Sequence, residues 1–119
     1  IWEWQVATGT CTWNDHNYRL LGYEPGEVQS SYQLWRSHVH PDDVADVEEK
    51  LTQALANHTE FEAECRLIQR DGSIHWELTK GQAIYDAAGQ PIRMIGVSFD
   101  ITDRKQAELE IRKFATLAE

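Results

Sequence analysis

Between residues 92 and 105 a strand pattern passes directly into a helical pattern, and this feature constrains the fold most. β-branched and aromatic residues dominate the strand, and both alternating sets of side chains are partly apolar, with Met94 in one set and Ile95 and Val97 in the other. A strand that is apolar on both sides is typical of a central position in a sheet. Good helix formers then continue to the end of the chain, with Thr102 placed as the N-cap. The pattern therefore predicts a central strand that feeds directly into an outgoing helix.

Four further strands are predicted where apolar and polar residues alternate, over residues 2–6, 11–13, 61–67 and 74–85. The pair Asp71-Gly72 marks a hairpin between the last two strands. This interpretation places four acidic side chains on solvent-facing strand surfaces: Glu60, Glu62, Glu64 and Glu77.

Helical patterns occupy residues 15–21, 32–37 and 41–55. The longest follows His40, has Pro41 at its first position and carries two carboxylates in its first turn, which are helix-start signals. Its apolar residues form a single face. Helices between two groups of strands indicate an α+β domain, in which the helices pack on one face of a five-stranded sheet.

Size and charge exclude several functional classes. A chain of 119 residues fits one domain, and its net charge of −9 argues against binding to nucleic acid or to an anionic membrane surface. No apolar run is long enough to span a membrane, so we expect no direct membrane contact from this segment.

Two cysteines, Cys11 and Cys65, are too few for a disulfide framework and favour a cytoplasmic setting. The chain opens on Ile1 and its last helix is still running at Glu119, so we expect a piece of a longer protein.

Two groups of residues resemble reactive sites, but each has a simpler structural role. His38 and His40, followed by Asp42 and Asp43, resemble a metal site in composition. Pro41, Asp42 and Asp43 are, however, typical of a helix start, and His40 then serves as a cap or packing residue. Ser37 beside His38 and Ser73 near His75 offer nucleophile–base neighbours, yet each pair lies in a cap or hairpin segment. We therefore expect neither a metal site nor an enzyme active site in this chain.

Several segments, in this order and spacing, resemble a PAS domain, and the resemblance extends from Trp2 to Lys105. The segments are Trp13-Asn14-Asp15 with Leu20-Leu21-Gly22-Tyr23, Val39-His40-Pro41-Asp42-Asp43, Glu64-Cys65-Arg66-Leu67 with Arg70-Asp71-Gly72-Ser73-Ile74-His75-Trp76, Tyr85-Asp86 with Gly89, and Ile95-Gly96-Val97-Ser98-Phe99-Asp100-Ile101-Thr102-Asp103-Arg104-Lys105. Within the family the chain is most similar to the tryptophan-rich bacterial type that precedes histidine kinases and diguanylate cyclases.

The resemblance implies a five-stranded antiparallel sheet of order 2-1-5-4-3, with short helices on one face and a C-terminal exit helix. It implies a sensor domain over residues 1–103 and the start of a signalling coiled-coil linker over 104–119. The expected function is a sensory or regulatory module that passes a ligand- or partner-induced change to an effector domain in the same chain. The alternative is a ligand-free dimerisation scaffold. The parent protein would be cytoplasmic, or a membrane-anchored receptor with this domain on its cytoplasmic side.

The family's ligand pocket lies between the sheet and the helices. By family position its expected lining is Tyr18, Leu21, Leu34, Trp35, Val47, Leu51, Phe61, Cys65, Trp76 and Met94. No histidine lies within residues 44–55, and no cysteine lies within residues 32–36, which argues against the family's usual haem and flavin-adduct arrangements. We therefore expect no bound cofactor, and the sequence does not identify the small-molecule ligand.

The exit helix carries Ala107, Ile111, Phe114 and Ala118 at spacings of a short heptad seam. The seam would either pack back on its own domain or join two copies in a parallel coiled coil, and the resemblance favours a homodimer. By the same resemblance Asp100, Thr102 and Arg104 would form the junction that transmits the signal from sheet to helix.

Overall fold

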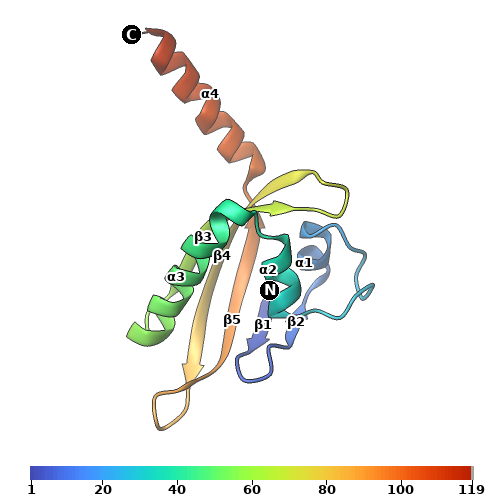
Figure 1. Cartoon of the computed structure of the whole chain (residues 1–119), viewed down its shortest axis with the longest axis vertical. Helices are drawn as coiled ribbons and strands as arrows, with labels where there is room; N and C mark the ends of the chain where they lie inside the picture. Colours follow the sequence, from blue (N-terminus) through green and yellow to red (C-terminus); the bar gives the residue numbers. More distant parts are fainter. Residues whose placement is uncertain (119) are drawn as a thin grey trace.

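The computed structural model describes residues 1–118 and forms an α+β domain with a projecting C-terminal helix (Figure 1). Its elements follow in the order β1 (Trp2–Gln5), β2 (Cys11–Trp13), α1 (Asp15–Leu20), α2 (Tyr32–His38), α3 (Pro41–Asn57), β3 (Phe61–Ile68), β4 (Ile74–Tyr85), β5 (Pro91–Asp100) and α4 (Thr102–Ala118). The predicted fold class is confirmed.

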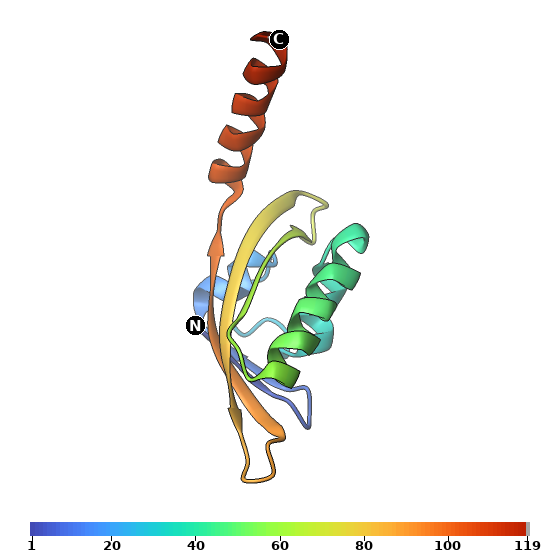
Figure 2. The ribbon, with the colours of Figure 1, turned by 90° about the vertical axis from the view of Figure 1, so that its left-hand side faces the viewer.

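The five strands form one antiparallel sheet in the order β2-β1-β5-β4-β3. β5 therefore lies in the middle, between β1 and β4, as its two partly apolar sides predict. Helices α2 and α3 cover one face of the sheet, whereas α4 leaves the sheet at the end of β5 and points away from it (Figure 2).

Local capping explains where the helices begin. Asn14 and Ser31 accept the backbone N–H groups of Asn17 and Leu34, at 3.1 and 3.0 Å, and so cap α1 and α2. At α3 the ring of His40 accepts the N–H of Asp42 at 3.1 Å, and Pro41 occupies the first helical position. These polar contacts satisfy N–H groups that have no partner inside a helix.

The core lies between α3 and the inner face of the sheet. The apolar face of α3 contributes Val47, Leu51 and Ala54, which are all buried. β3 alternates as predicted, and its inward set is fully or almost fully buried: Phe61, Ala63, Cys65 and Leu67.

In β4 the side chains that face the core are not the ones that were predicted to do so. In β4 the inward set contains Glu77 and Thr79, while Trp76 faces the opposite side of the sheet. Glu77 is only 2% exposed, so its assignment to a solvent-facing surface is wrong. The cause is pairing: Cys65 lies directly opposite Glu77, and residues paired across antiparallel strands share a face.

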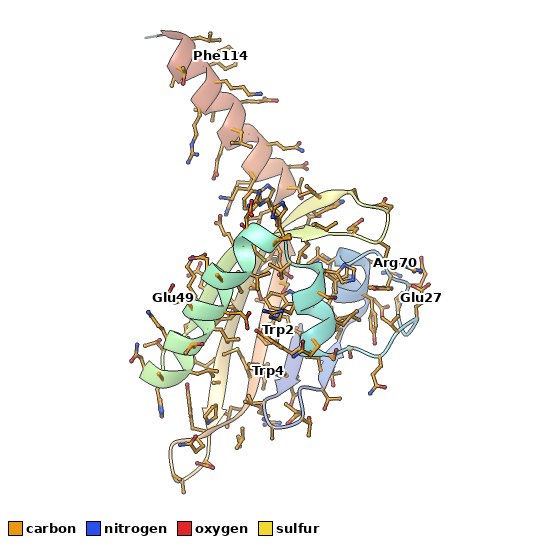
Figure 3. All side chains as sticks on the ribbon, viewed as in Figure 1. Trp2, Trp4, Glu27, Glu49, Arg70 and Phe114 are labelled. Carbon is orange, nitrogen blue, oxygen red and sulfur yellow. The ribbon has the colours of Figure 1, made fainter. Side chains whose placement is uncertain are left out.

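The exit helix does not fold back on the domain. Within the described residues its large apolar side chains are exposed: Leu109, Ile111, Phe114 and Leu117. Figure 3 places Phe114 toward the free end of α4, far from the sheet. The seam residue Ala118 is helical, but its side chain lies outside the described part of the structure.

Candidate functional site: an indole-lined cavity and the strand–helix junction

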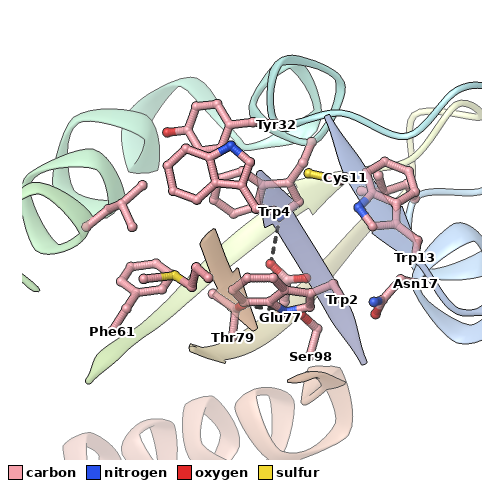
Figure 4. A pocket seen from close by; sticks show the side chains of 14 residues that line it. Trp2, Trp4, Cys11, Trp13, Asn17, Tyr32, Phe61, Glu77, Thr79 and Ser98 are labelled. Carbon is pink, nitrogen blue, oxygen red and sulfur yellow. Dashed lines mark hydrogen bonds between the residues drawn. The ribbon is translucent and has the colours of Figure 1, made fainter. Parts of the chain in front are cut away.

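A cavity of about 60 Å³ lies between the inner face of the sheet and the helices (Figure 4). Five of the residues predicted from family position line it: Leu21, Trp35, Leu51, Phe61 and Met94. Nine further residues outside the predicted set also line the cavity: Trp2, Trp4, Cys11, Trp13, Asn17, Tyr32, Glu77, Thr79 and Ser98. Most of the additions come from β1, β2 and β4.

The other five predicted residues lie elsewhere. Tyr18 packs edge-on against Trp13, with ring centroids 5.3 Å apart, and Val47 and Cys65 are buried in the core. Leu34 is absent from the lining, and Trp76 lies on the outer face of the sheet. There Trp76 lies beneath the Lys105 ammonium, 4.9 Å from the ring centroid, and near the Arg66 guanidinium at 5.6 Å.

Trp2 of β1 lies on two glycines that face each other across β4 and β5. Gly81 and Gly96 are directly paired, and the Trp2 indole lies across both. A methyl group added to Gly96 would lie 2.2 Å from the indole and 2.2 Å from the Lys80 carbonyl oxygen. The absence of side chains at these two positions therefore makes the space that the Trp2 ring occupies.

Glu77 is the buried carboxyl group of this cavity. Its Oε1 accepts the Trp35 indole N–H at 3.0 Å and lies 3.7 Å from the Cys65 thiol. Burial raises the pKa of the Glu77 carboxyl to about 7, against the opposing effect of the Trp35 hydrogen bond. The same burial, together with the nearby Glu77 charge, raises the pKa of Cys65, so this thiol stays protonated.

Three buried polar atoms of the described residues have no hydrogen-bond partner: the indole nitrogens of Trp2 and Trp4 and the amide oxygen of Asn17. All three belong to residues that line the cavity. Buried polar groups are nearly always paired, and an unpaired one costs about 1–3 kcal/mol. These three unpaired atoms therefore lower the stability of the folded domain.

The junction between sheet and exit helix is held by hydrogen bonds among Trp76, Asp100 and Thr102. The Thr102 hydroxyl accepts the backbone N–H of Trp76 at 3.0 Å and donates to the Asp100 carboxylate. Asp100 also accepts the backbone N–H of Thr102 at 2.9 Å. Although partial burial opposes it, hydrogen bonding from Thr102 and His75 lowers the pKa of Asp100, so this carboxylate is charged at neutral pH.

The prediction that Thr102 is the N-cap of the exit helix is therefore wrong. Thr102 is the first residue of α4, and its hydroxyl bonds to β4 instead of to an N–H of its own helix. Asp100 binds the first helical N–H in its place. The N–H of Ile101 also donates to the Trp76 carbonyl oxygen at 2.9 Å. Both the N–H and the C=O of Trp76 are therefore hydrogen-bonded to residues at the start of the exit helix.

Arg104 reaches back to the sheet through Glu64 of β3, which also pairs with Lys105. These hydrogen bonds, chiefly that from Lys105, lower the pKa of Glu64. Such exposed ion pairs contribute little energy individually. Their geometry nevertheless ties the first turn of α4 to an outer strand as well as to β4.

His38, Asp43 and Ser37, which resemble parts of reactive sites in the sequence, have structural partners. His38 lies between the Tyr23 hydroxyl, at 2.9 Å, and the Ile68 carbonyl oxygen, at 2.7 Å. Asp43 accepts the backbone N–H and the guanidinium of Arg66, which lower its pKa despite partial burial. Ser37 donates to the carbonyl of its own helix. Among the described residues no cluster of three or more potential metal ligands is found.

Within residues 1–118 no helix combines the length and the apolar character needed to cross a bilayer.

Comparison with known proteins gives a consistent family. A family described as PAS fold matches residues 10–98. The chain is 27% identical over 107 residues to the probable diguanylate cyclase DgcE of Escherichia coli, and 29% identical over 112 residues to the sensor protein FixL of Bradyrhizobium diazoefficiens. These alignments cover 89% and 93% of this chain but only 9% and 22% of the two relatives.

Two solved structures extend the comparison. A sensory box histidine kinase/response regulator from Burkholderia thailandensis superimposes with a TM-score of 0.89 at 32% identity, covering 98% of this chain and 87% of that one. The N-terminal domain of a diguanylate cyclase with PAS/PAC sensor from Marinobacter aquaeolei superimposes with a TM-score of 0.76 at 25% identity. The match covers 87% of this chain and 95% of that one. From its fold, its motifs and these matches, the chain belongs to the PAS fold family.

Proposed function

We propose that this domain is a sensory module that controls an effector, either a histidine kinase or a cyclic-dinucleotide enzyme, through α4. The module catalyses no reaction itself, acts as a homodimer and works in the cytoplasm, alone or as the cytoplasmic part of a receptor. The named relatives support this assignment, since they are described as a sensor protein, a histidine kinase and a probable diguanylate cyclase. In this proposal residues 1–103 sense the signal and residues 104–119 begin the linker.

The observation that carries the proposal is the double attachment of Trp76 to the start of α4. Trp76 is the immediate neighbour of Glu77, which lines the cavity, and the Trp76 backbone bonds to both Ile101 and Thr102. A shift of β4 caused by a change in the cavity would therefore move the first turn of the helix. Because a switch between two states needs an energy gap of only a few kcal/mol, hydrogen bonds of this kind can bias it.

The dimer part of the proposal depends on α4. The helix projects from the domain with Ile111 and Phe114 exposed, so the seam is free to pair with a second copy. A rigid attachment at Thr102 and a pairing seam further along would convert a local shift at the sheet into a change of helix register or separation.

The test is effector output. The chain is joined through α4 to a histidine kinase catalytic region, and autophosphorylation is measured for Asp100→Ala, Thr102→Ala and the control Thr116→Ala. Thr116 lies on the same helix, and its hydroxyl bonds only within the helix, to the Arg112 carbonyl oxygen. We expect both junction variants to change output by about fivefold, as a loss of about 1 kcal/mol would. Unchanged output in folded junction variants would exclude the junction route.

The same assay separates the sensory module from the dimerisation scaffold. A scaffold without a ligand would support dimer-dependent output that is insensitive to changes inside the cavity. In that case Glu77→Gln would leave kinase output at the level of the unmodified fusion, whereas the sensory module predicts that it differs.

A further inference from the structure

We propose that this domain responds to protons, and that Glu77 takes up and releases the proton and thereby changes how the sheet holds α4. This inference rests on the proposed function and names the signal that the sensory module reads. It depends on two observations: the neutral surroundings of the Glu77 side chain, and the place of the Glu77 backbone between the two attachments of α4.

The Glu77 carboxyl has only neutral hydrogen-bond partners. Its Oε1 accepts the Trp35 indole N–H at 3.0 Å and lies 3.7 Å from the Cys65 thiol. The hydroxyls of Thr79 and Ser98 face the same cavity and are bonded to each other at 3.2 Å. In the part of the chain that the structure describes, none of the ion pairs includes Glu77. A buried carboxylate without a counter-charge is costly, so the neutral form is favoured.

The charged groups on the neighbouring elements are paired with one another. Asp100 of β5 lies opposite Glu77 in the sheet, and its carboxylate is bonded to His75 of β4 at 3.2 Å. Asp43 of α3 is paired with Arg66 of β3, with 2.7 Å between a carboxylate oxygen and a guanidinium nitrogen. These groups therefore bring no spare positive charge to the Glu77 carboxyl.

Burial consequently decides the charge of Glu77. It raises the pKa of this carboxyl to about 7, while the hydrogen bonds with Trp35, Ser98 and Cys65 act in the opposite direction. Cys65, the titratable group in contact with it, has a raised pKa and remains a neutral thiol. Between about pH 6 and about pH 8 the carboxyl therefore passes from mostly protonated to mostly ionised.

The Glu77 backbone lies between the two attachments of α4. Its neighbour in the chain, Trp76, bonds to Thr102 through its N–H and to Ile101 through its carbonyl oxygen. Its partner across the sheet, Asp100, accepts the N–H of Thr102 at 2.9 Å. An ionised carboxylate needs stronger polar partners than the neutral acid does, so its surroundings must rearrange when the proton leaves. A shift of β4 at Glu77 reaches both attachments directly.

The first test follows the carboxyl group and the junction together by NMR of the whole chain. The side-chain ¹³C carboxyl signal of Glu77 and the backbone amide signals of Trp76 and Thr102 are recorded from about pH 5.5 to about pH 8.5. We expect all three to titrate with one midpoint near pH 7, and the amide shifts to disappear in Glu77→Gln, which cannot ionise. The amide of Thr116, further along α4, serves as the reference.

His75 is the alternative source of such shifts, because it is titratable and bonds Asp100. His75→Gln should leave the midpoint of the amide shifts within about half a pH unit if Glu77 is the sensor. Trp35→Phe removes the indole donor, whose hydrogen bond favours the charged carboxyl, and should raise the midpoint by about one pH unit. This second variant decides the matter if Glu77→Gln does not fold.

Three results of this titration would overturn the inference. One is a Glu77 midpoint near the ordinary value of 4.5. Another is a Glu77 titration near pH 7 that leaves the Trp76 and Thr102 amides unmoved. The third is a set of amide shifts that survives Glu77→Gln and vanishes in His75→Gln.

The second test asks whether the proton changes output. Autophosphorylation of the kinase fusion is measured over the same pH range and divided by that of the Glu77→Gln fusion, so that the pH dependence of the kinase itself cancels. We expect this ratio to change by about fivefold between about pH 6 and about pH 8, as the loss of one hydrogen bond at the junction would.

The two proposals can fail separately. A ratio that stays constant with pH, while Asp100→Ala and Thr102→Ala still alter output, would overturn the proton signal and leave the proposed function standing. Junction variants without effect on output would remove the proposed function, whereas the amide titration would still show whether Glu77 moves the start of α4.

Discussion

The hydroxyl of Thr102, the first residue of α4, accepts the backbone N–H of Trp76, near the start of β4, at a distance of 3.0 Å. Two segments 26 residues apart are thus joined where the sheet ends and the helix begins. Trp76 precedes Glu77 of the cavity, so one peptide unit separates the junction from the buried carboxyl group. The connection is short, and each of its bonds can be removed singly.

Replacing Thr102 by Val should lower the free energy of unfolding by about 1–2 kcal/mol, because the Trp76 N–H loses its acceptor. Thr102→Ser keeps the hydroxyl and should cost less than about 0.5 kcal/mol. Urea unfolding of the two variants gives the comparison, with Thr116→Val as the control on the exposed part of the helix. Equal losses for Val and Ser would show that the hydroxyl does not stabilise the junction.

Glu77 should make the domain less stable as the pH rises. Its pKa is raised to about 7 in the folded state, so the folded protein holds the proton more tightly than the unfolded chain does. The stability it contributes is complete below the unfolded pKa of about 4.5 and is lost as the pH rises through about 7. The loss amounts to about 3 kcal/mol at most, from a difference of roughly 2.5 pKa units.

The test of this pH dependence is Glu77→Gln, which keeps an oxygen for the Trp35 indole and does not ionise. The variant should match the unmodified protein at about pH 5 and exceed it in stability at about pH 8. Comparing the two proteins at each pH cancels the contributions of Asp43, Glu64 and Asp100, whose lowered pKa values act in the opposite direction. If the difference in unfolding free energy between the two proteins stayed constant across this pH range, the raised pKa of the buried Glu77 carboxyl would be contradicted.

Gly96→Ala should be the most damaging single methyl addition in the sheet. The new Cβ would meet the Trp2 indole and the backbone carbonyl of Lys80, both at 2.2 Å, and the backbone contact cannot be relieved by a rotamer change. We expect a loss of about 3 kcal/mol or more, at the upper end for overpacking. Gly81→Ala is the matched control, because its close contacts, at 2.6 and 2.9 Å, are the ends of the Trp2 and Met94 side chains. Thermal unfolding that ranks Gly81→Ala as equally damaging would contradict this difference.

Much of the fold could be predicted because its signals are local. The alternation of β3, the Asp71-Gly72 hairpin and the helix start at Pro41 each depend on neighbouring residues, and each appears in the structure. The central place of β5 followed from apolar residues on both of its sides, and the family resemblance supplied the strand order.

The cavity was harder to predict because it depends on long-range pairing. The bulky residues Trp76 and Leu78 identify β4 as a strand, but both lie on its outer face. The prediction therefore placed Glu77 on the wrong side of the sheet. The signal that would have corrected this was the register of the hairpin: with Ile68 opposite Ile74, counting back places Cys65, on the clean inward set of β3, opposite Glu77. No comparable local signal brings the N-terminal Trp2 and Trp4 to β5, since that pairing joins the two ends of the domain.

Acidic substitutions on the seam of α4 should separate the proposed dimer without unfolding the domain. Ile111 and Phe114 are 68% and 73% exposed, so each contributes little to the stability of a single copy. Ile111→Glu and Phe114→Glu should raise the dimer dissociation constant by about tenfold or more, because each would bury a charge against an apolar partner. Thr116→Glu adds the same charge on the opposite side of the helix and serves as the control. Sedimentation velocity at increasing concentration measures the constant. A dimer equally sensitive to Thr116→Glu would be held by some surface other than the Ile111–Phe114 stripe, and α4 would then transmit the signal without pairing along that seam.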